Sequence, residues 1–440
     1  MKVSKRFGIF CQVLGVAVPL ARAAWATQPL DAFLTRAEAQ SFDSREASAT
    51  ERQRDAEADA ALGRLTPTLT ARGIYTRNQY EVSAPLPDLP EPLVITPQDQ
   101  LDAVIQLDVP LIDLGNYYRY RSARELARGA SAQRDATTID VSRSVARAYY
   151  LYVGAWALVR SARESIDAAD ANRSYVEARR GAGAATDLDL ERASANVERA
   201  RQDLADAELG VALSARSLET LSGLRPEPSE TSPAEDDLHS EGALESWLEL
   251  AGRSPATRVA GHQKAAAEQN RKAARMSLLP TLSGAAQERV SNATGFNGRS
   301  SNYSLQVVLS WRLDYGLMAT DGAQQAALEA QSVRRERTER AVVDAAFEAY
   351  QRVDNGIAKS RAARAQARAA ARAAALAQER YTVGAATQLD VTQAQRDAFL
   401  ASASQIQADF DLAYARAALR LAAGVPISTE RAPSAAEMKQ

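Results

Sequence analysis

The sequence predicts a mainly α-helical protein with β strands, built from two copies of one structural unit. The duplication is visible in two short segments: residues 183–189 read Gly-Ala-Ala-Thr-Asp-Leu-Asp, and residues 384–390 read Gly-Ala-Ala-Thr-Gln-Leu-Asp. Each follows a long run without proline, at 116–180 and 317–381, which indicates a long helix. Each run in turn follows a segment of alternating apolar and polar residues, which indicates a strand. An internal repeat of this size determines the architecture.

Composition favours closely packed helices and excludes several classes of protein. The 440 residues are 46% hydrophobic, and much of that fraction is alanine, which favours helix and buries little area. The formal net charge is −2, so nothing predicts binding to nucleic acid. His239 and His262 lack metal-ligand spacing, and the chain has no Gly-x-Ser-x-Gly motif and no phosphate-binding loop. We therefore expect no enzyme, no cofactor and no metal site.

The N-terminus predicts a signal peptide at residues 1–26. Basic residues open the chain, an apolar run extends from Phe7 to Leu20, and small residues suited to cleavage follow, with the cut expected after Ala26. A membrane anchor is the alternative, but the apolar run is too short to span a bilayer. The single cysteine, Cys11, lies in this segment, so the mature chain would contain no thiol and no disulfide. We expect an exported protein.

Four segments are predicted to form two β-hairpins. In residues 101–109 and 303–313, apolar side chains occupy one face and mostly polar ones the other, as in a strand that separates lipid from water. A half-buried strand of a soluble sheet has the same alternation, so the pattern alone leaves both possibilities open. Beyond residue 26 no apolar run approaches about 18 residues, so any membrane crossing must use strands. The partner strands are expected at 68–79 and 281–291, with exposed loops at 81–97 and 291–302.

The long helices need partners along their length. At 1.5 Å per residue, a helix over 116–180 would extend roughly 98 Å. Its apolar residues are spaced 4-3-4-3, which is typical of a coiled-coil seam, and the second copy carries a matching set. The two seams comprise Val145, Tyr149, Tyr152, Trp156 and Val159, and Val342, Ala346, Ala349 and Val353.

The strand count predicts the assembly. One chain offers four strands, which cannot close a barrel, and an open sheet in lipid leaves unsatisfied backbone groups that cost several kcal/mol each. Two chains would supply eight strands and a plugged barrel, whereas three would supply twelve strands and a pore. We expect a homotrimer.

The sequence resembles the TolC-type outer-membrane factor family over nearly the whole mature chain. The resemblance rests on the duplicated order of elements, on Leu-Pro-Thr-Leu-Ser at 279–283, and on the pattern Tyr-x-Val-Gly-x-x-Thr-x-Leu-Asp-Val from Tyr381 to Val391. It implies a trimeric 12-strand β-barrel in the outer membrane, with four strands per chain. A long α-helical barrel with a mixed equatorial belt would continue it across the periplasm.

The resemblance divides the chain into eight parts. These are a signal peptide (1–26), an equatorial N-terminal helix (27–64), the first β-hairpin of the barrel (65–114), the first long helical hairpin (115–223), an equatorial linker with helices (224–277), the second β-hairpin (278–315), the second long helical hairpin (316–424) and a C-terminal tail (425–440).

In the resembling family the helix turns lie at the periplasmic tip, where they meet a periplasmic adaptor protein that couples the channel to an inner-membrane pump. Glycine permits a tight turn at Gly183 and Gly384, and threonine suits the start of the returning helix. The first turn has Ala182 where the second has a valine that matches the family. A plain helix–turn–helix is the alternative. The candidate adaptor-contact residues are Gly183, Ala184, Thr186, Val383, Gly384, Ala385 and Thr387.

Acidic side chains just past these turns line the tunnel aperture in the resembling family, which implies a ring of three carboxylates at Asp189 and another at Asp390. Such rings favour cations, and their like charges raise one another's pKa. Tyr381 matches a tyrosine that bonds an aspartate of the neighbouring hairpin and holds the aperture closed, and Asp189 is its candidate partner. The chain departs from the family pattern at Ala386 and Gln393, where the family has a basic and an acidic residue. The alternative for both aspartates is a solvated charge that favours a helix start.

The expected function is the outer-membrane channel of a tripartite efflux system, which exports small molecules that an inner-membrane pump delivers through the adaptor. Two alternatives stay open. One is the outer-membrane channel of a type I protein secretion system. The other is a periplasmic coiled-coil scaffold, which would not need four alternating strands. The expected partners are two further copies of the chain, outer-membrane lipid, the periplasmic adaptor and the inner-membrane pump.

Overall fold

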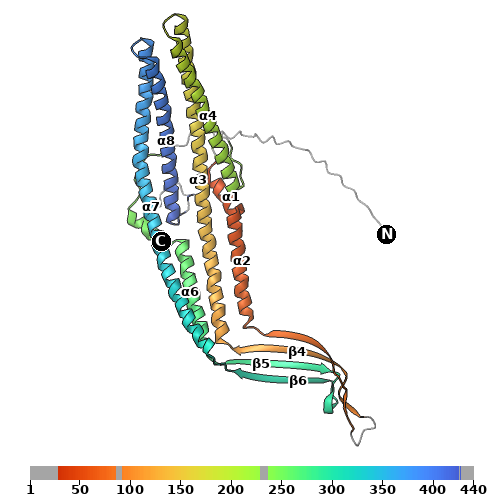
Figure 1. Cartoon of the computed structure of the whole chain (residues 1–440). Helices are drawn as coiled ribbons and strands as arrows, with labels where there is room; N and C mark the ends of the chain where they lie inside the picture. The colour runs from red at the N-terminus through yellow and green to blue at the C-terminus, as the bar shows by residue number, and fades with distance from the viewer. Residues whose placement is uncertain (1–27, 86–91, 228–235, 426, 428–440) are drawn as a thin grey trace, which may run out of the picture.

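The computed structural model describes residues 28–85, 92–227, 236–425 and 427, and it shows an elongated molecule (Figure 1). A rod of helices continues at one end into a β-sheet that bends away from it. The predicted signal peptide and all but two residues of the predicted tail lie outside the described residues.

The elements follow the order that the repeat predicts. The helices are α1 Leu30–Gln40, α2 Phe42–Gly63, α3 Leu114–Gly181, α4 Asp187–Ser222, α5 Leu244–Gly252, α6 Pro255–Met276, α7 Tyr315–Thr382 and α8 Gln388–Ala422, with a short 3-10 turn, η1, at Gly295–Asn297. The strands are β1 Thr68–Arg77, β2 Val82–Ala84, β3 Leu93–Thr96, β4 Asp99–Ile112, β5 Thr281–Ser291 and β6 Ser301–Ser310.

The two proline-free runs form the two longest helices, as predicted. α3 and α7 contain 68 residues each, which is about 100 Å of helix at 1.5 Å per residue. Each begins after an aspartate whose carboxylate accepts a hydrogen bond from a backbone N–H of the first turn. Asp113 accepts from Asn116 at 2.8 Å, and Asp314 accepts from Leu317 at 2.9 Å. The duplicated aspartate therefore fixes the start of both long helices.

Different shorter helices pack on the two halves of each long helix. α4 packs on the part of α3 remote from the sheet, and α8 packs in the same way on α7 (Figure 1). Nearer the sheet, α2 packs along α3, and α6 lies between α3 and α7. α2 and α6 come from segments assigned to the equatorial belt, yet they run lengthwise. The shorter α1 and α5 are the helices found at mid-height.

The core follows the predicted seam of α3. Val145 and Val159 are buried, and the buried Tyr152 donates its hydroxyl to the carbonyl of Glu227 at 2.8 Å. Glycine brings the two repeats close at one point, because a Cβ added to Gly154 would lie 2.8 Å from the ring of Phe410 on α8. This contact packs the first helical hairpin directly against the second.

The four predicted strands pair as one antiparallel sheet in the order β1-β4-β5-β6. β4 pairs with β5, which joins the hairpins of the two repeats edge to edge. The prediction of a plain loop at 81–97 is wrong in part, because β2 and β3 pair within it as a small second hairpin. Val94 and Ile95 are β-branched and favour a strand, but the neighbouring prolines outweighed this signal in the prediction.

The apolar face of the main sheet is exposed, and in β4 it is the more exposed of the two faces. Leu305 of β6 is 75% exposed, and Leu101 and Ile105 of β4 are 60% and 54% exposed. Asp102 of β4 points the other way, is buried, and pairs with Arg289 of β5 at 2.7 Å. A soluble sheet buries its apolar side chains, so this orientation supports the lipid-facing alternative.

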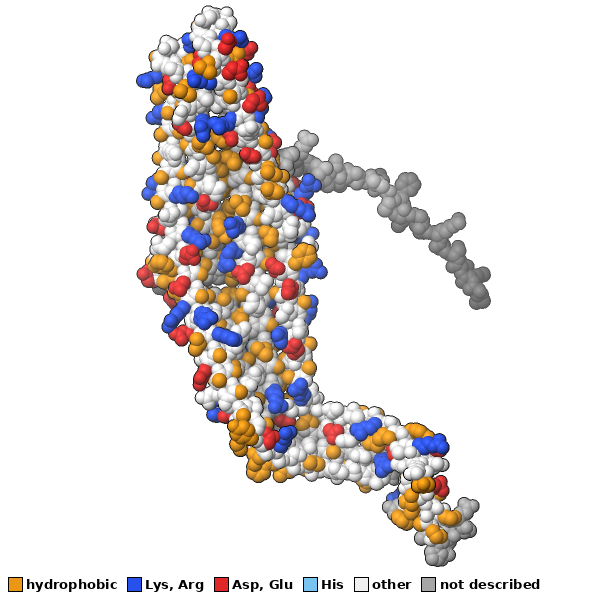
Figure 2. All heavy atoms as spheres, in the orientation of Figure 1, with side chains coloured by type: hydrophobic (Ala, Val, Ile, Leu, Met, Phe, Trp, Pro, Cys, Tyr) orange, Lys and Arg blue, Asp and Glu red, His pale blue; other side chains and the backbone are white. Residues whose placement is uncertain are grey.

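Charged side chains are frequent on the face of the helical rod that Figure 2 shows. Figure 2 shows acidic and basic side chains interspersed along its length. Among the described residues, none of the helices combines the length and the apolar character that a membrane span requires.

Candidate functional site at the hairpin tips

Two turns of the same backbone geometry close the helical hairpins at the end remote from the sheet (Figure 1). Gly183 and Gly384 have φ angles of 77° and 78°, in the left-handed region that side chains disfavour. In the first turn, the N–H of Ala184 donates to the carbonyl of Arg179 at 2.8 Å, and the N–H of Gly183 donates to the carbonyl of Arg180 at 2.9 Å. The second turn repeats both bonds. Both long helices therefore end in a Schellman motif.

Threonine caps both returning helices, as predicted, and the two candidate aspartates complete the caps. The Thr186 hydroxyl accepts from the Asp189 N–H at 3.2 Å, while the Asp189 carboxylate accepts from the Thr186 N–H at 3.1 Å and its hydroxyl at 2.7 Å. Thr387 and Asp390 form the same capping box. Within one chain these bonds lower the pKa of both carboxyl groups, mainly through the Thr186 side chain at Asp189 and the Thr387 backbone at Asp390. Both aspartates thus stabilise the turns.

The seven candidate adaptor-contact residues are all exposed at the tips. Val383 is 78% exposed, so its apolar side chain projects into solvent. The two turns differ in their surroundings, because Arg180 pairs with Asp187 at 2.6 Å in the first turn. The equivalent positions in the second turn hold Tyr381 and Gln388. The tips therefore share a backbone but present different side chains.

Tyr381 belongs to a buried cluster that joins the two hairpins near their tips. It packs with Val176 of α3 and Val391 of α8. The ring of Tyr175 lies edge-on at 5.8 Å from the ring of Tyr381. The guanidinium of Arg179 lies 5.0 Å from the centre of the Tyr381 ring and donates to the Tyr381 carbonyl at 2.8 Å. We call Tyr175, Arg179 and Tyr381 the tip clamp.

The predicted pair of Tyr381 and Asp189 is close but not bonded within the chain. Burial raises the pKa of the Tyr381 hydroxyl, and the nearby Asp189 charge adds to the rise while Arg179 opposes it. No hydrogen bond between the two side chains is found in the described part of the chain, and the Asp189 carboxylate is engaged by Thr186. Tyr175 and Arg179 were not among the predicted site residues. The signal was present, since an aromatic and a cationic residue four positions apart share one helix face.

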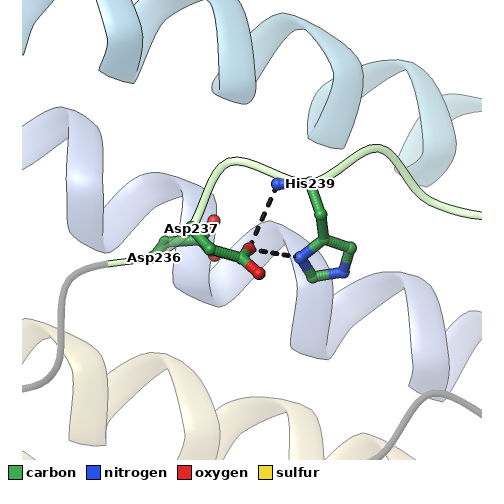
Figure 3. Close-up of side chains that lie close together, drawn as sticks. All are labelled: Asp236, Asp237 and His239. Atoms are coloured by element: carbon green, nitrogen blue, oxygen red, sulfur yellow. Dashed lines mark hydrogen bonds and ion pairs between the residues drawn. The ribbon is translucent and has the colours of Figure 1, made fainter.

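A second polar cluster lies at mid-height, outside the predicted site residues. Asp236, Asp237 and His239 form the one group, among the residues described, whose possible metal-binding atoms lie close together (Figure 3). Asp237 turns toward His239 and contacts its Nδ1 at 2.5 Å, while Asp236 binds the guanidinium of Arg416 at 2.7 and 3.0 Å. Glu241 binds the same guanidinium at 2.5 Å. The cation already present is Arg416, so we interpret Asp236, Glu241 and Arg416 as a structural clasp, named here the mid-height clasp.

Comparison with known families decides the identity. The sequence model of the outer membrane efflux protein family matches residues 33–224 and 248–425, which covers most of the chain. The chain belongs to the outer membrane efflux protein family. The match includes both tip turns and all four strands of the main sheet. A search of the curated proteins finds no match to the sequence.

Solved structures of outer-membrane channels share the fold. A membrane protein from Pseudomonas aeruginosa has a TM-score of 0.79 at 22% identity, and the match covers 92% of each chain. The Campylobacter jejuni CmeC outer membrane channel has a TM-score of 0.76 at 15% identity, covering 96% of this chain and 93% of that one. The open state of the Neisseria gonorrhoeae MtrE outer membrane channel has a TM-score of 0.72 at 20% identity, covering 90% of this chain and 89% of that one.

These findings confirm the predicted architecture of this outer membrane efflux protein. The fold is that of trimeric channels, in which the strands of three chains form one β-barrel and the helical hairpins continue it as a tunnel. The protein lies in the outer membrane, and its tunnel extends into the periplasm. The outward apolar face of the sheet therefore meets lipid, and the tip turns lie at the periplasmic end.

Proposed function

We propose that this efflux protein is the exit channel of a tripartite system that exports small molecules. The tip turns carry the proposal. Each has a Schellman end, a capping box and exposed contact residues, so it presents a rigid surface to a partner at the periplasmic end. Two turns in each of three chains would offer six similar surfaces to a periplasmic adaptor. The adaptor would connect the tunnel to an inner-membrane pump, which would select the exported molecules.

Replacing Val383 with aspartate tests the proposed coupling. The side chain is exposed, so the change should leave folding intact while it places a charge on the proposed adaptor surface. Cells that lack the wild-type protein and produce Val383→Asp should retain a fluorescent dye that cells with the wild-type protein export. The purified variant should form a heat-stable trimer with wild-type conductance in planar bilayers.

The matched control is Ala182→Asp, the same change at the equivalent position of the first turn, where the family valine is missing. We expect this control to reduce dye export less. The type I secretion alternative predicts a different result in cells that lack the channel. Such cells would export the dye normally but would retain a protein that wild-type cells secrete. Full dye export by Val383→Asp would count against the second turn as the adaptor contact.

We further propose that Asp390 of each chain faces the tunnel aperture and favours cations. Asp390→Asn removes the charge and keeps an oxygen that can accept the capping bonds from Thr387. The reversal potential across a salt gradient should move toward zero if the carboxylate ring selects cations. Asp390→Ala removes both the charge and the cap. Because both variants lose the charge, we expect them to shift the reversal potential equally. A shift in the alanine variant alone would assign the effect to the cap.

A further inference from the structure

A stripe of tyrosine and arginine lies on α3 directly beside the sheet. Leu114, Tyr117, Arg121, Arg124 and Arg128 are all exposed. Their spacing of 3-4-3-4 places them on one face of the helix. The stripe thus runs along the first four turns of α3, starting two residues after β4 ends.

Within one chain, the neighbouring helices leave this face uncovered. On one flank of α3, Arg134 pairs with Glu51 of α2 at 2.9 Å, and on the other the Ser122 hydroxyl donates to the carbonyl of Ala266 on α6 at 3.0 Å. Along this face a shallow groove of about 360 Å³ lies among side chains of α3 itself. It is lined by Tyr117, Tyr120, Arg121, Arg124, Glu125 and Arg128.

The groove carries positive charge that the protein does not neutralise. Arg128 pairs with Glu125 at 2.6 Å. Arg124 donates to the neutral hydroxyl of Tyr120 at 3.1 Å. Within the described residues, neither Arg121 nor Arg124 forms an ion pair with a carboxylate. Two guanidinium groups are therefore available for an anion, and phosphate oxygens fit their paired N–H donors.

The stripe begins where the lipid-facing surface ends. Leu111 of β4 is exposed, and Leu114 and Tyr117 carry the exposed apolar surface into the helix. In the second repeat, the positions equivalent to Leu114 and Tyr117 hold Tyr315 and Met318, which are also exposed. Side chains on a helix point toward its N-terminus, so the arginines reach back toward the membrane. Tyrosine beside arginine at this level is typical of the boundary between acyl chains and headgroups.

We propose that this stripe binds the headgroup phosphate of an anionic phospholipid in the periplasmic leaflet of the outer membrane, one lipid for each chain. Arg121 and Arg124 bind the phosphate, and Tyr117 lies against the acyl chains at the end nearest the headgroup. The second repeat lacks the site, because the positions equivalent to the three arginines hold Gly322, Gln325 and Glu329. Around the trimer, the lipid sites on the three copies of α3 therefore alternate with the equivalent surfaces of α7, which lack these arginines.

Native mass spectrometry of the detergent-purified trimer tests the proposal. The trimer is titrated with phosphatidylglycerol and, separately, with phosphatidylcholine. We expect up to three bound phosphatidylglycerol molecules and a preference of about tenfold over phosphatidylcholine, because only the anionic lipid brings a net charge to the arginines. The double variant Arg121→Gln with Arg124→Gln should lose this preference. The matched control Arg368→Gln with Arg372→Gln removes two exposed arginines from the tip half of α7 and should keep it.

Three outcomes would overturn the proposal. The first is equal binding of the two lipids by the wild type, and the second is an undiminished preference in the Arg121 and Arg124 variant. The third is displacement of phosphatidylglycerol by millimolar inorganic phosphate, which would assign the site to free phosphate. If phosphatidylglycerol stays bound to the trimer in the presence of millimolar inorganic phosphate, the result supports a lipid site. The trimer mass of each variant verifies its assembly in the same spectrum, and the readout does not depend on what the channel exports.

Discussion

Replacing Arg416 with methionine is expected to destabilise the folded protein by about 3 kcal/mol, because removing one partner of a buried ion network leaves the other charges uncompensated. Arg416 is 9% exposed, and its guanidinium is held between Asp236 and Glu241. Glu241 is itself almost fully covered, so its carboxylate would stay inside without a cation. The temperature at which the heat-stable trimer dissociates on gels should fall clearly below that of the wild type.

The mid-height clasp also supplies the control for this prediction. Combining Arg416→Met with Asp236→Asn and Glu241→Gln removes every charge of the clasp together, so no buried carboxylate lacks a partner. We expect this triple variant to recover much of the lost dissociation temperature. A wild-type dissociation temperature in Arg416→Met alone would show that the clasp does not stabilise the protein.

The parts of this structure that local sequence controls could be predicted closely. α3 spans 114–181 against a predicted 116–180, because absence of proline and a duplicated aspartate define it. Both tip turns were located from a glycine and a threonine, since a left-handed residue and an N-cap depend on their immediate neighbours. The strands were located by their alternation, which the lipid-facing surface imposes.

The contacts between segments far apart in the chain could not be predicted in the same way. Arg179 and Tyr381 lie 202 positions apart, and Asp236 and Arg416 lie 180 apart. Such pairs depend on how distant segments of the chain pack against each other, which neither segment specifies alone. The β2–β3 hairpin is a local element, but it was not predicted either. The strand signal of its residues is weak, and the prolines around them gave a stronger loop signal.

Replacing Arg179 with methionine is expected to raise the resting conductance of the channel. Arg179 is the charged member of the tip clamp, and it links α3 of the first hairpin to the end of α7 in the second. A charge-assisted bond to a carbonyl and a contact with an aromatic face together contribute about 2 kcal/mol. Loss of that amount would favour separated hairpin tips by about 30-fold. Single-channel recordings in planar bilayers would measure the effect.

Two further variants separate the tip clamp from the predicted latch between Tyr381 and Asp189. Tyr381→Phe removes only the hydroxyl and keeps both the ring and the carbonyl that Arg179 contacts. A conductance increase in Tyr381→Phe would support the latch, whereas an increase confined to Arg179→Met would assign closure to the clamp. Arg173→Met removes an exposed arginine from α3 outside the clamp and should leave conductance unchanged. Arg179→Met removes the contacts of the guanidinium with the ring and the carbonyl of Tyr381. Wild-type conductance in this variant would therefore show that the tip clamp does not hold the hairpin tips together.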